Sequence, residues 1–158
     1  MPDERPFVAF RFEVALTLKD PQRFGLPATL CGAAFAECDG LEMTMETRAV
    51  REGGNNGQQI HLAGPVSYGS LRLKRGMTRD LDLWTWFEVA AGARRRARGI
   101  TADGVVTVKD SDGSRQLTFS LAGVLPVKLK AAALNGKDGA IALEEMQLAY
   151  RSFTVKAG

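Results

Sequence analysis

Hydrophobic and polar residues alternate along most of the chain, and this alternation is typical of β-strands with one buried face. The first alternating segment runs from Val8 to Leu18, where every second residue is large and apolar. Asp20-Pro21 ends it, because proline cannot donate to a sheet ladder. After a turn at Gly25-Leu26-Pro27, we expect a second, short strand between Cys31 and Glu37.

The cleanest alternation lies between Leu41 and Ala49, where apolar or small residues alternate with charged or polar ones. It predicts a half-buried strand. From Arg51 to Tyr68 the sequence is polar and contains four glycines, a proline and two adjacent asparagines, which indicates a long loop or an extended hairpin outside the core. Loops of this length in compact domains usually have a function.

A strand and the one expected helix come next. Ser70 to Arg75 has the alternation of a strand whose leucines point inward. In the helix that follows, Thr78 can act as the cap, and Asp80 and Asp82 lie where the helix dipole favours acids. Apolar residues then recur at spacings of three and four, and the helix should end near Gly92.

The rest of the chain predicts strands again. The expected strands are Val105–Lys109, Gln116–Leu121, Val124–Lys130, Ile141–Tyr150 and Phe153–Lys156, with a turn at Asp110–Gly113. Between Ile141 and Tyr150 the apolar residues change from odd to even positions, so we expect a bulge at Glu144-Glu145.

These elements predict a mainly β fold, an antiparallel β-barrel or sandwich with one packed α-helix and an extended loop. The helix would lie on the outside or plug an end. With 158 residues, 45% hydrophobic and 25% charged, the chain has an ordinary globular composition. There is no internal repeat or linker, so we expect a single domain over residues 1–158.

Several motifs occur in an order and spacing that resemble those of one known family. They are Asp39-Gly40-Leu41-Glu42, Val50-Arg51-Glu52-Gly53-Gly54-Asn55, Leu71–Thr78, Leu83-Trp84-Thr85-Trp86, Val108–Gly113, Pro126-Val127-Lys128, Leu134-Asn135 and Ile141–Ala149. Together they resemble the tail-tube proteins of contractile phages and of phage-derived contractile injection systems. The chain departs from the family pattern at Leu125, where an aromatic is usual, and at Tyr150-Arg151, where the family has His-Glu.

The resemblance implies hexameric rings that stack into a hollow tube, with the sheets of neighbouring subunits joined edge to edge around the lumen. It implies contacts with sheath, baseplate and cap proteins and a payload in the lumen, either a protein effector or DNA. The chain would form the repeated tube, or a ring that initiates or terminates it. The alternative from another class is a monomeric β-barrel binding module.

The glycine-rich segment is our candidate for contacts between rings. Its residues are Arg51, Glu52, Gly53, Gly54, Asn55, Asn56 and Gln58. A plain flexible loop is the alternative. A phosphate-binding loop is disfavoured, because no helix follows and the Gly-Lys-Ser/Thr ending is missing.

A basic cluster after the expected helix is the second candidate, for contact with a sheath or a neighbouring subunit. Its residues are Arg94, Arg95, Arg96 and Arg98. Two other interpretations stay open: solvated charges that complement the helix dipole, and nucleic-acid binding, which the absence of interleaved aromatics disfavours. Trp84 and Trp86 cannot share a helix face, so we expect Trp86 in the core and Trp84 at a boundary.

Candidate chemistry is sparse. His61 is the only histidine, and no serine or cysteine lies in a nucleophile elbow, so we expect no enzyme activity. Glu144 and Glu145 should point to opposite faces of their strand unless the bulge intervenes, unlike a catalytic carboxylate pair. Cys31 and Cys38 with His61 are too few for a zinc site and are expected to be reduced thiols. We therefore expect no cofactor or metal.

The sequence contains no apolar run of the roughly 20 residues that span a bilayer. The segment Met1–Pro6 lacks the features of a secretion signal. We therefore expect synthesis and assembly in the cytoplasm without a membrane anchor, in a particle that is either released or retained.

Overall fold

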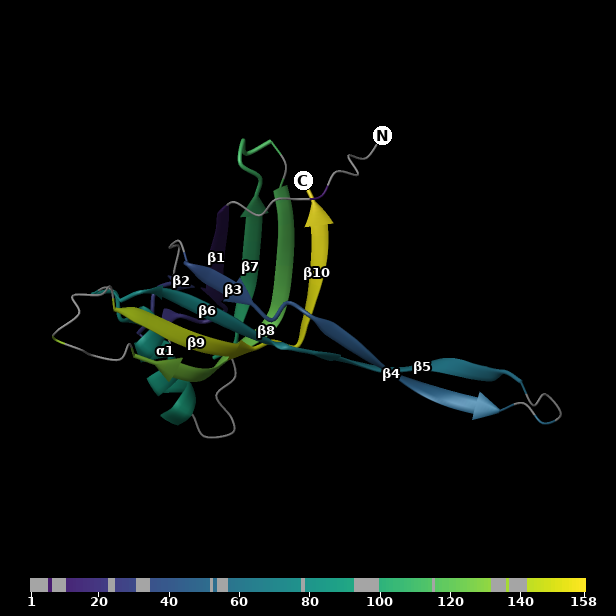
Figure 1. Ribbon diagram of the computed structural model, residues 1–158. Helices are drawn as coiled ribbons and strands as arrows, with labels where there is room; N and C mark the ends of the chain where they lie inside the picture. The colour runs from purple at the N-terminus through teal and green to yellow at the C-terminus, as the bar shows by residue number, and fades with distance from the viewer. Residues whose placement is uncertain are drawn as a thin grey trace.

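The computed structural model describes most of the chain as strands with one helix (Figure 1). The described residues are 6, 11–22, 25–30, 35–51, 53, 57–77, 79–92, 100–114, 116–131, 136 and 142–158. The elements are β1 (Arg11–Leu18), β2 (Thr29–Leu30), β3 (Glu37–Asp39), β4 (Met43–Arg51), β5 (Gln59–Tyr68), β6 (Ser70–Gly76), α1 (Asp82–Gly92), β7 (Ala102–Lys109), β8 (Gln116–Lys130), β9 (Leu143–Ala149) and β10 (Ser152–Ala157).

All strand pairs are antiparallel, and one sheet has the order β2-β1-β7-β8-β9-β6-β3, with β10 also paired to β8. The 15-residue strand β8 belongs to two layers. Its first half pairs with β7 and β10, and its second half pairs with β9. Between them lies Gly123, whose φ of +65° favours glycine. We call β2, β1, β7, the first half of β8 and β10 the first layer, and the second half of β8 with β9, β6 and β3 the second layer.

The hydrophobic core lies between these layers, whose strands cross at a steep angle in Figure 1. The alternation predicted for the first strand and for Ser70–Arg75 is confirmed, because Val14, Leu16, Leu71 and Leu73 are all buried. The mainly β sandwich with one packed helix is therefore the observed fold.

Helix α1 packs against β8 and contributes Leu83 and Trp86 to the core. Trp86 is in the core and the helix ends at Gly92, both as predicted. The indole Nε1 of Trp86 donates a 2.8 Å hydrogen bond to the carbonyl of Ile100. At the start, the Asp80 carboxylate accepts a 3.0 Å hydrogen bond from the amide of Asp82. The predicted cap, Thr78, lies outside the described residues.

The prediction of a half-buried strand at Leu41–Ala49 is wrong. Strand β4 is exposed at all nine of its residues, because it leaves the two layers and pairs only with β5 in a projecting hairpin. Of the two predictions for the segment that follows, the extended hairpin is the one observed. The loop between the paired strands is short, since β4 ends at Arg51 and β5 begins at Gln59.

The predicted bulge at Glu144-Glu145 is also wrong. Strand β9 is in unbroken register with β6, and Glu144 lies on the buried face with Met146 and Leu148. Because no bulge intervenes, the two glutamates point to opposite faces of the strand. A register shift does occur nearby, in β8 between Pro126 and Lys128.

Two strand boundaries also differ from the prediction. The segments predicted as separate strands on either side of Gly123 form the single strand β8. The short strand expected between Cys31 and Glu37 differs in its described part, since Phe35 and Ala36 belong to no strand and β3 begins at Glu37; residues 31–34 lie outside the described part. Among the described residues, no helix has the length and apolar character needed to cross a bilayer.

Candidate assembly surfaces

The hairpin of β4 and β5 is the most exposed part of the molecule, and it extends well beyond the two layers (Figure 1). Its large apolar side chains have exposed fractions of 40% or more; they are Met43, Met45, Val50, Ile60, Leu62 and Val66. A two-stranded hairpin is marginally stable alone in water, and contiguous exposed apolar side chains mark interaction sites. The hairpin therefore has the character of a surface that another chain covers.

The exposed apolar residues divide between the two faces of the hairpin. Met45 pairs with Val66 and Thr47 with Ala63, so β5 contains one residue more than β4 at this point. Residues that pair across antiparallel strands share a face. One extra residue in a strand moves every later residue of that strand to the opposite face from the one that alternation alone would give. The base patch (Met43, Met45 and Val66) consequently lies on one face, and the tip patch (Val50, Ile60 and Leu62) on the other.

A glycine permits this bulge. A Cβ atom at Gly64 would lie 2.4 Å from the carbonyl oxygen of Glu46, which is closer than real contacts allow. The bulge at Gly64-Pro65 therefore requires glycine, and it sets which apolar side chains lie on which face.

The base of the hairpin is attached to the body by Tyr150, which follows β9. Its hydroxyl donates a 2.7 Å hydrogen bond to the carbonyl of Gly40 and accepts a 3.2 Å bond from the amide of Glu42. Its ring packs edge-on against Tyr68 at a centroid distance of 5.9 Å, and Phe153 adjoins both rings. Burial raises the pKa of the Tyr150 hydroxyl above its ordinary value. These contacts fix the direction in which the hairpin leaves the body.

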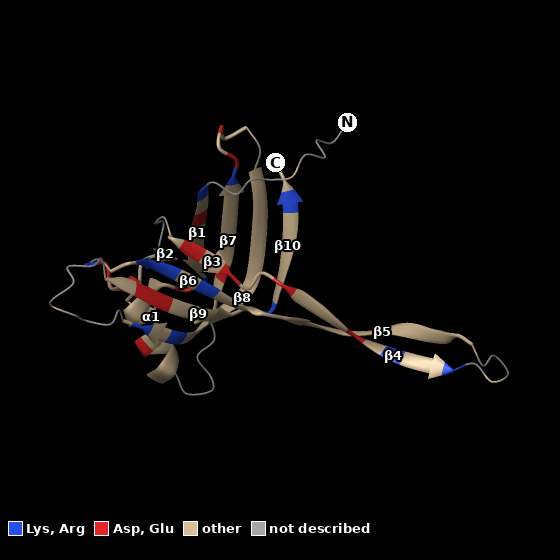
Figure 2. Ribbon diagram, in the orientation of Figure 1, with Lys and Arg blue, Asp and Glu red and all other residues tan. Residues whose placement is uncertain are grey.

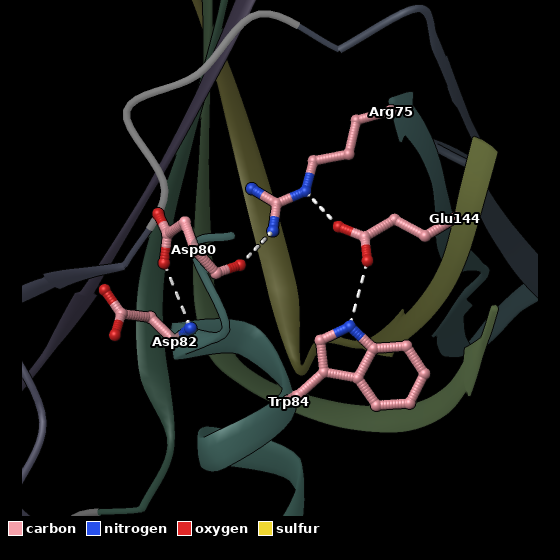
Figure 3. Close-up of polar contacts among 5 residues, drawn as sticks. All are labelled: Arg75, Asp80, Asp82, Trp84 and Glu144. Carbon is pink, nitrogen blue, oxygen red and sulfur yellow. Dashed lines mark hydrogen bonds and ion pairs between the residues drawn. The ribbon is translucent and has the colours of Figure 1, made fainter. Parts of the chain in front are cut away.

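A buried ion pair joins the second layer to the helix (Figure 3). Arg75 of β6 and Glu144 of β9 are directly paired, and Arg75 Nε donates to Glu144 Oε1. The other carboxylate oxygen accepts a 2.9 Å hydrogen bond from Trp84 Nε1. Arg75 Nη2 lies 3.4 Å from the carbonyl oxygen of Asp80, just before the helix. Trp84 is thus at the predicted boundary, held by a polar partner that the sequence did not indicate.

Both ends of the first layer are open edges. Strand β10 pairs only with β8, and β2 covers the outer side of β1 only at Leu16 and Thr17. Among the described strands, none pairs with the outer edge of β10 or with the outer edge of β1 at residues 12–15. Unpaired strand edges readily add a further strand from another chain.

The structure covers only part of the predicted site residues. Arg51, Gly53 and Gln58 are exposed at the hairpin tip. Glu52, Gly54, Asn55 and Asn56 lie outside the described residues, as do Arg94, Arg95, Arg96 and Arg98, which follow α1.

The residues considered for chemistry are scattered. His61 is exposed in β5, opposite Ala49. Cys38 is a free, half-buried thiol. Burial and the neighbouring Asp39 raise its pKa to about 11. Cys31 lies outside the described residues. Within the described ranges, no three His, Cys, Asp or Glu side chains are grouped as metal ligands.

Comparison with known proteins agrees with this architecture. The family model of the T4-like virus tail tube protein gp19 matches residues 8–154. A chain in a structure of the anti-feeding prophage baseplate is 26% identical, with a TM-score of 0.77 and 97% of each chain covered. A chain in the sheath-tube complex of the extracellular contractile injection system PVC is 17% identical, with a TM-score of 0.73, covering 99% of this chain and 95% of that one.

A chain in the tube-terminating cap of the anti-feeding prophage is 15% identical, again with a TM-score of 0.73, covering 100% of this chain and 95% of that one. At these lower identities the likeness shows the fold. No curated protein matches the sequence. The predicted resemblance is confirmed, and the chain belongs to the T4-like virus tail tube protein gp19 family.

Proposed function

We propose that this protein is a structural subunit of the inner tube of a contractile injection system or phage tail. Six copies form a ring, and the rings stack into a hollow conduit through which a payload passes when the surrounding sheath contracts. The observation that carries this proposal is the open edge at each end of the first layer. The anti-feeding prophage baseplate, which contains the 26% identical chain, was reconstructed with 6-fold symmetry.

The strand directions of the first layer suit ring closure. Strands β1, β7, β8 and β10 alternate in direction, so β10 runs antiparallel to β1. A copy rotated about an axis along these strands presents its β1 to the β10 of its neighbour. The new pair is then antiparallel, and closing the ring removes both open edges.

The outward face of the first layer would line the lumen. Its side chains are mostly small or hydroxyl-bearing, with charges of both signs: Arg11, Glu13, Ala15, Thr17, Asp103, Val105, Thr107, Lys109, Gln116, Thr118, Ser120, Thr154 and Lys156. Such a face is wettable and has no large apolar side chain apart from Val105, which suits a conduit for either a protein effector or DNA. This role is mechanical and needs no catalytic group.

The hairpin supports the stacking of rings. Its base patch and its tip patch both expose large apolar side chains, which contact with neighbouring copies would cover. We propose that the tip, from Arg51 to Gln58, contacts the next ring.

Deleting Gly53–Gly57 tests this stacking role. The hairpin strands would still be joined, so the fold and the ring should survive while stacking is lost. Negative-stain electron microscopy would then show single rings in place of tubes, and circular dichroism would check the fold. Tubes of normal length from the deletion variant would refute the role proposed for the tip.

A ring that initiates or terminates the tube is a second candidate within the same apparatus. The observation that favours it is the fold likeness to the tube-terminating cap, whose TM-score equals that of the sheath-tube chain. Such a protein would form one ring and not polymerise. In either role we propose sheath, baseplate and cap proteins as partners, with assembly in the cytoplasm and a particle that is released or retained.

A further inference from the structure

The outward face of the second layer carries charges in a regular order across four strands. In the first row, Lys130 of β8 is opposite Glu145 of β9, which is opposite Lys74 of β6, which is opposite Glu37 of β3. The signs alternate. Lys74 Nζ lies 3.3 Å from Glu37 Oε2 and 3.5 Å from Glu145 Oε1, and these carboxylates, Glu37 first, raise the pKa of Lys74. Figure 2 shows the basic band of β6 between acidic bands of β3 and β9.

The second row breaks this order. Lys128 of β8 is opposite Gln147 of β9, which is opposite Arg72 of β6, which is opposite Asp39 of β3. A neutral amide therefore occupies the position that a carboxylate has in the first row. Neither Lys128 nor Arg72 forms an ion pair with any residue in the described part of the chain.

A groove of about 330 Å³ follows these two rows. Its lining has one carboxylate, that of Glu145, and four cationic side chains, which are Arg72, Lys74, Lys128 and Lys130. Neighbouring strands are about 4.8 Å apart, so the backbones at Lys128 and Arg72 are separated by roughly 10 Å. Both side chains are long enough to reach an anionic group that lies over Gln147.

We propose that this groove binds an acidic segment of a protein partner, with one carboxylate of the segment lying over Gln147 between Arg72 and Lys128. That carboxylate would complete the alternating order of the second row. Arg72 and Lys128 would donate charge-assisted hydrogen bonds to it, and the Gln147 amide could donate a third.

A protein fits the face better than a nucleic acid does. Glu37, Asp39 and Glu145 lie on the same face and would repel a continuous polyanion, since double-stranded DNA carries one charge per about 1.7 Å of its axis. Separate carboxylates on a peptide can avoid these acids. Binding does not depend on ring formation. Only the position of the partner outside the conduit depends on the proposed function, because this face belongs to the layer opposite the proposed lumen.

The test uses a fluorescent peptide of alternating glutamate and serine, with a glutamine-serine peptide and single-stranded DNA as comparison probes. Fluorescence anisotropy at low ionic strength measures binding to the full-length protein. The double variant Arg72→Gln, Lys128→Gln should bind the acidic peptide about tenfold more weakly. The matched control Lys109→Gln, Lys156→Gln removes the same charge from the first layer and should bind like the wild type.

A second variant, Gln147→Glu, supplies the missing carboxylate from the protein itself. It should weaken peptide binding at least as much as the double variant, while Gln116→Glu, with the same charge change at the start of β8, should not. The proposal is overturned if the acidic peptide does not bind, if the control pair loses as much affinity, or if Gln147→Glu binds normally. If the DNA binds more tightly than the acidic peptide, and the groove variants lose this binding, the groove would be assigned to nucleic acid instead. Ring formation, followed by native mass measurement, is independent of each of these results.

Discussion

The ion pair between Arg75 and Glu144 fixes the helix start to the second layer. Both side chains are almost fully buried, with residue exposures of 3% and 2%. A buried pair stabilises little compared with apolar residues of the same size, but removing one partner leaves an uncompensated charge. Here Trp84 and the carbonyl of Asp80 satisfy further hydrogen-bonding groups of the pair. The pair therefore sets the register of β6 against β9 and the position of α1 together.

Substituting Glu144→Gln should destabilise the fold strongly, because Arg75 would remain a buried cation without its counter-charge. We expect a loss of about 3–5 kcal/mol in the free energy of unfolding, measured by urea denaturation. The control is Glu145→Gln, which lies next to it on the exposed face and should change stability by less than about 1 kcal/mol, because its ion pair with Lys74 is exposed to solvent. Equal effects of the two substitutions would contradict this role of Glu144.

The hydroxyl of Tyr150 gives a second prediction. Tyr150→Phe keeps the aromatic contacts with Tyr68 and Phe153 but removes the bonds to Gly40 and Glu42. We expect a loss of about 1 kcal/mol and faster amide hydrogen exchange at Glu42. Tyr68→Phe is the matched control, since its hydroxyl makes no hydrogen bond to a described residue. Unchanged exchange at Glu42 in the Tyr150 variant would show that the hydroxyl does not hold the hairpin base.

At the scale of elements, the hairpin is a ribbon whose apolar faces change over at the bulge. Alternation in the sequence correctly predicted that Leu41–Ala49 is extended, but it was wrong about burial. The reason is physical: alternation shows which side chains share a face, and it does not show whether the covering surface comes from the same chain. The same alternation is expected in a strand whose apolar face is covered by a neighbouring copy.

The tip patch should act in assembly and not in folding. The double variant Val50→Ser, Ile60→Ser replaces exposed side chains, so the free energy of unfolding of the monomer should change by less than about 1 kcal/mol. Stacking should nevertheless weaken, which sedimentation would show as a shift from tubes to rings. Val127→Ser, with a similar exposure in the second layer, is the control. If the control shortens tubes as much as the double variant, the effect is not specific to the tip patch.

At the scale of the whole molecule, the sheet turns at β8, so that the first layer and the second layer pack on opposite sides of the core. The sequence predicted the strands, the helix and the family, because these depend on local patterns and motifs. The order of the strands in the layers could not be predicted from the sequence. Strand β6 pairs with β9 across about 70 residues, and the turn within β8 depends on a single glycine with positive φ. Glu144 was misread for the same reason, because its buried partner Arg75 lies 69 residues away.

Ring formation is the central claim, and the mass of the native assembly tests it most directly. Purified protein would be measured by native mass spectrometry and imaged by negative-stain electron microscopy across a range of concentration and salt. We predict rings of six subunits or stacked hollow tubes. A protein that stays strictly monomeric in every condition, including after addition of its cognate baseplate, would contradict the tube subunit and favour a monomeric binding module.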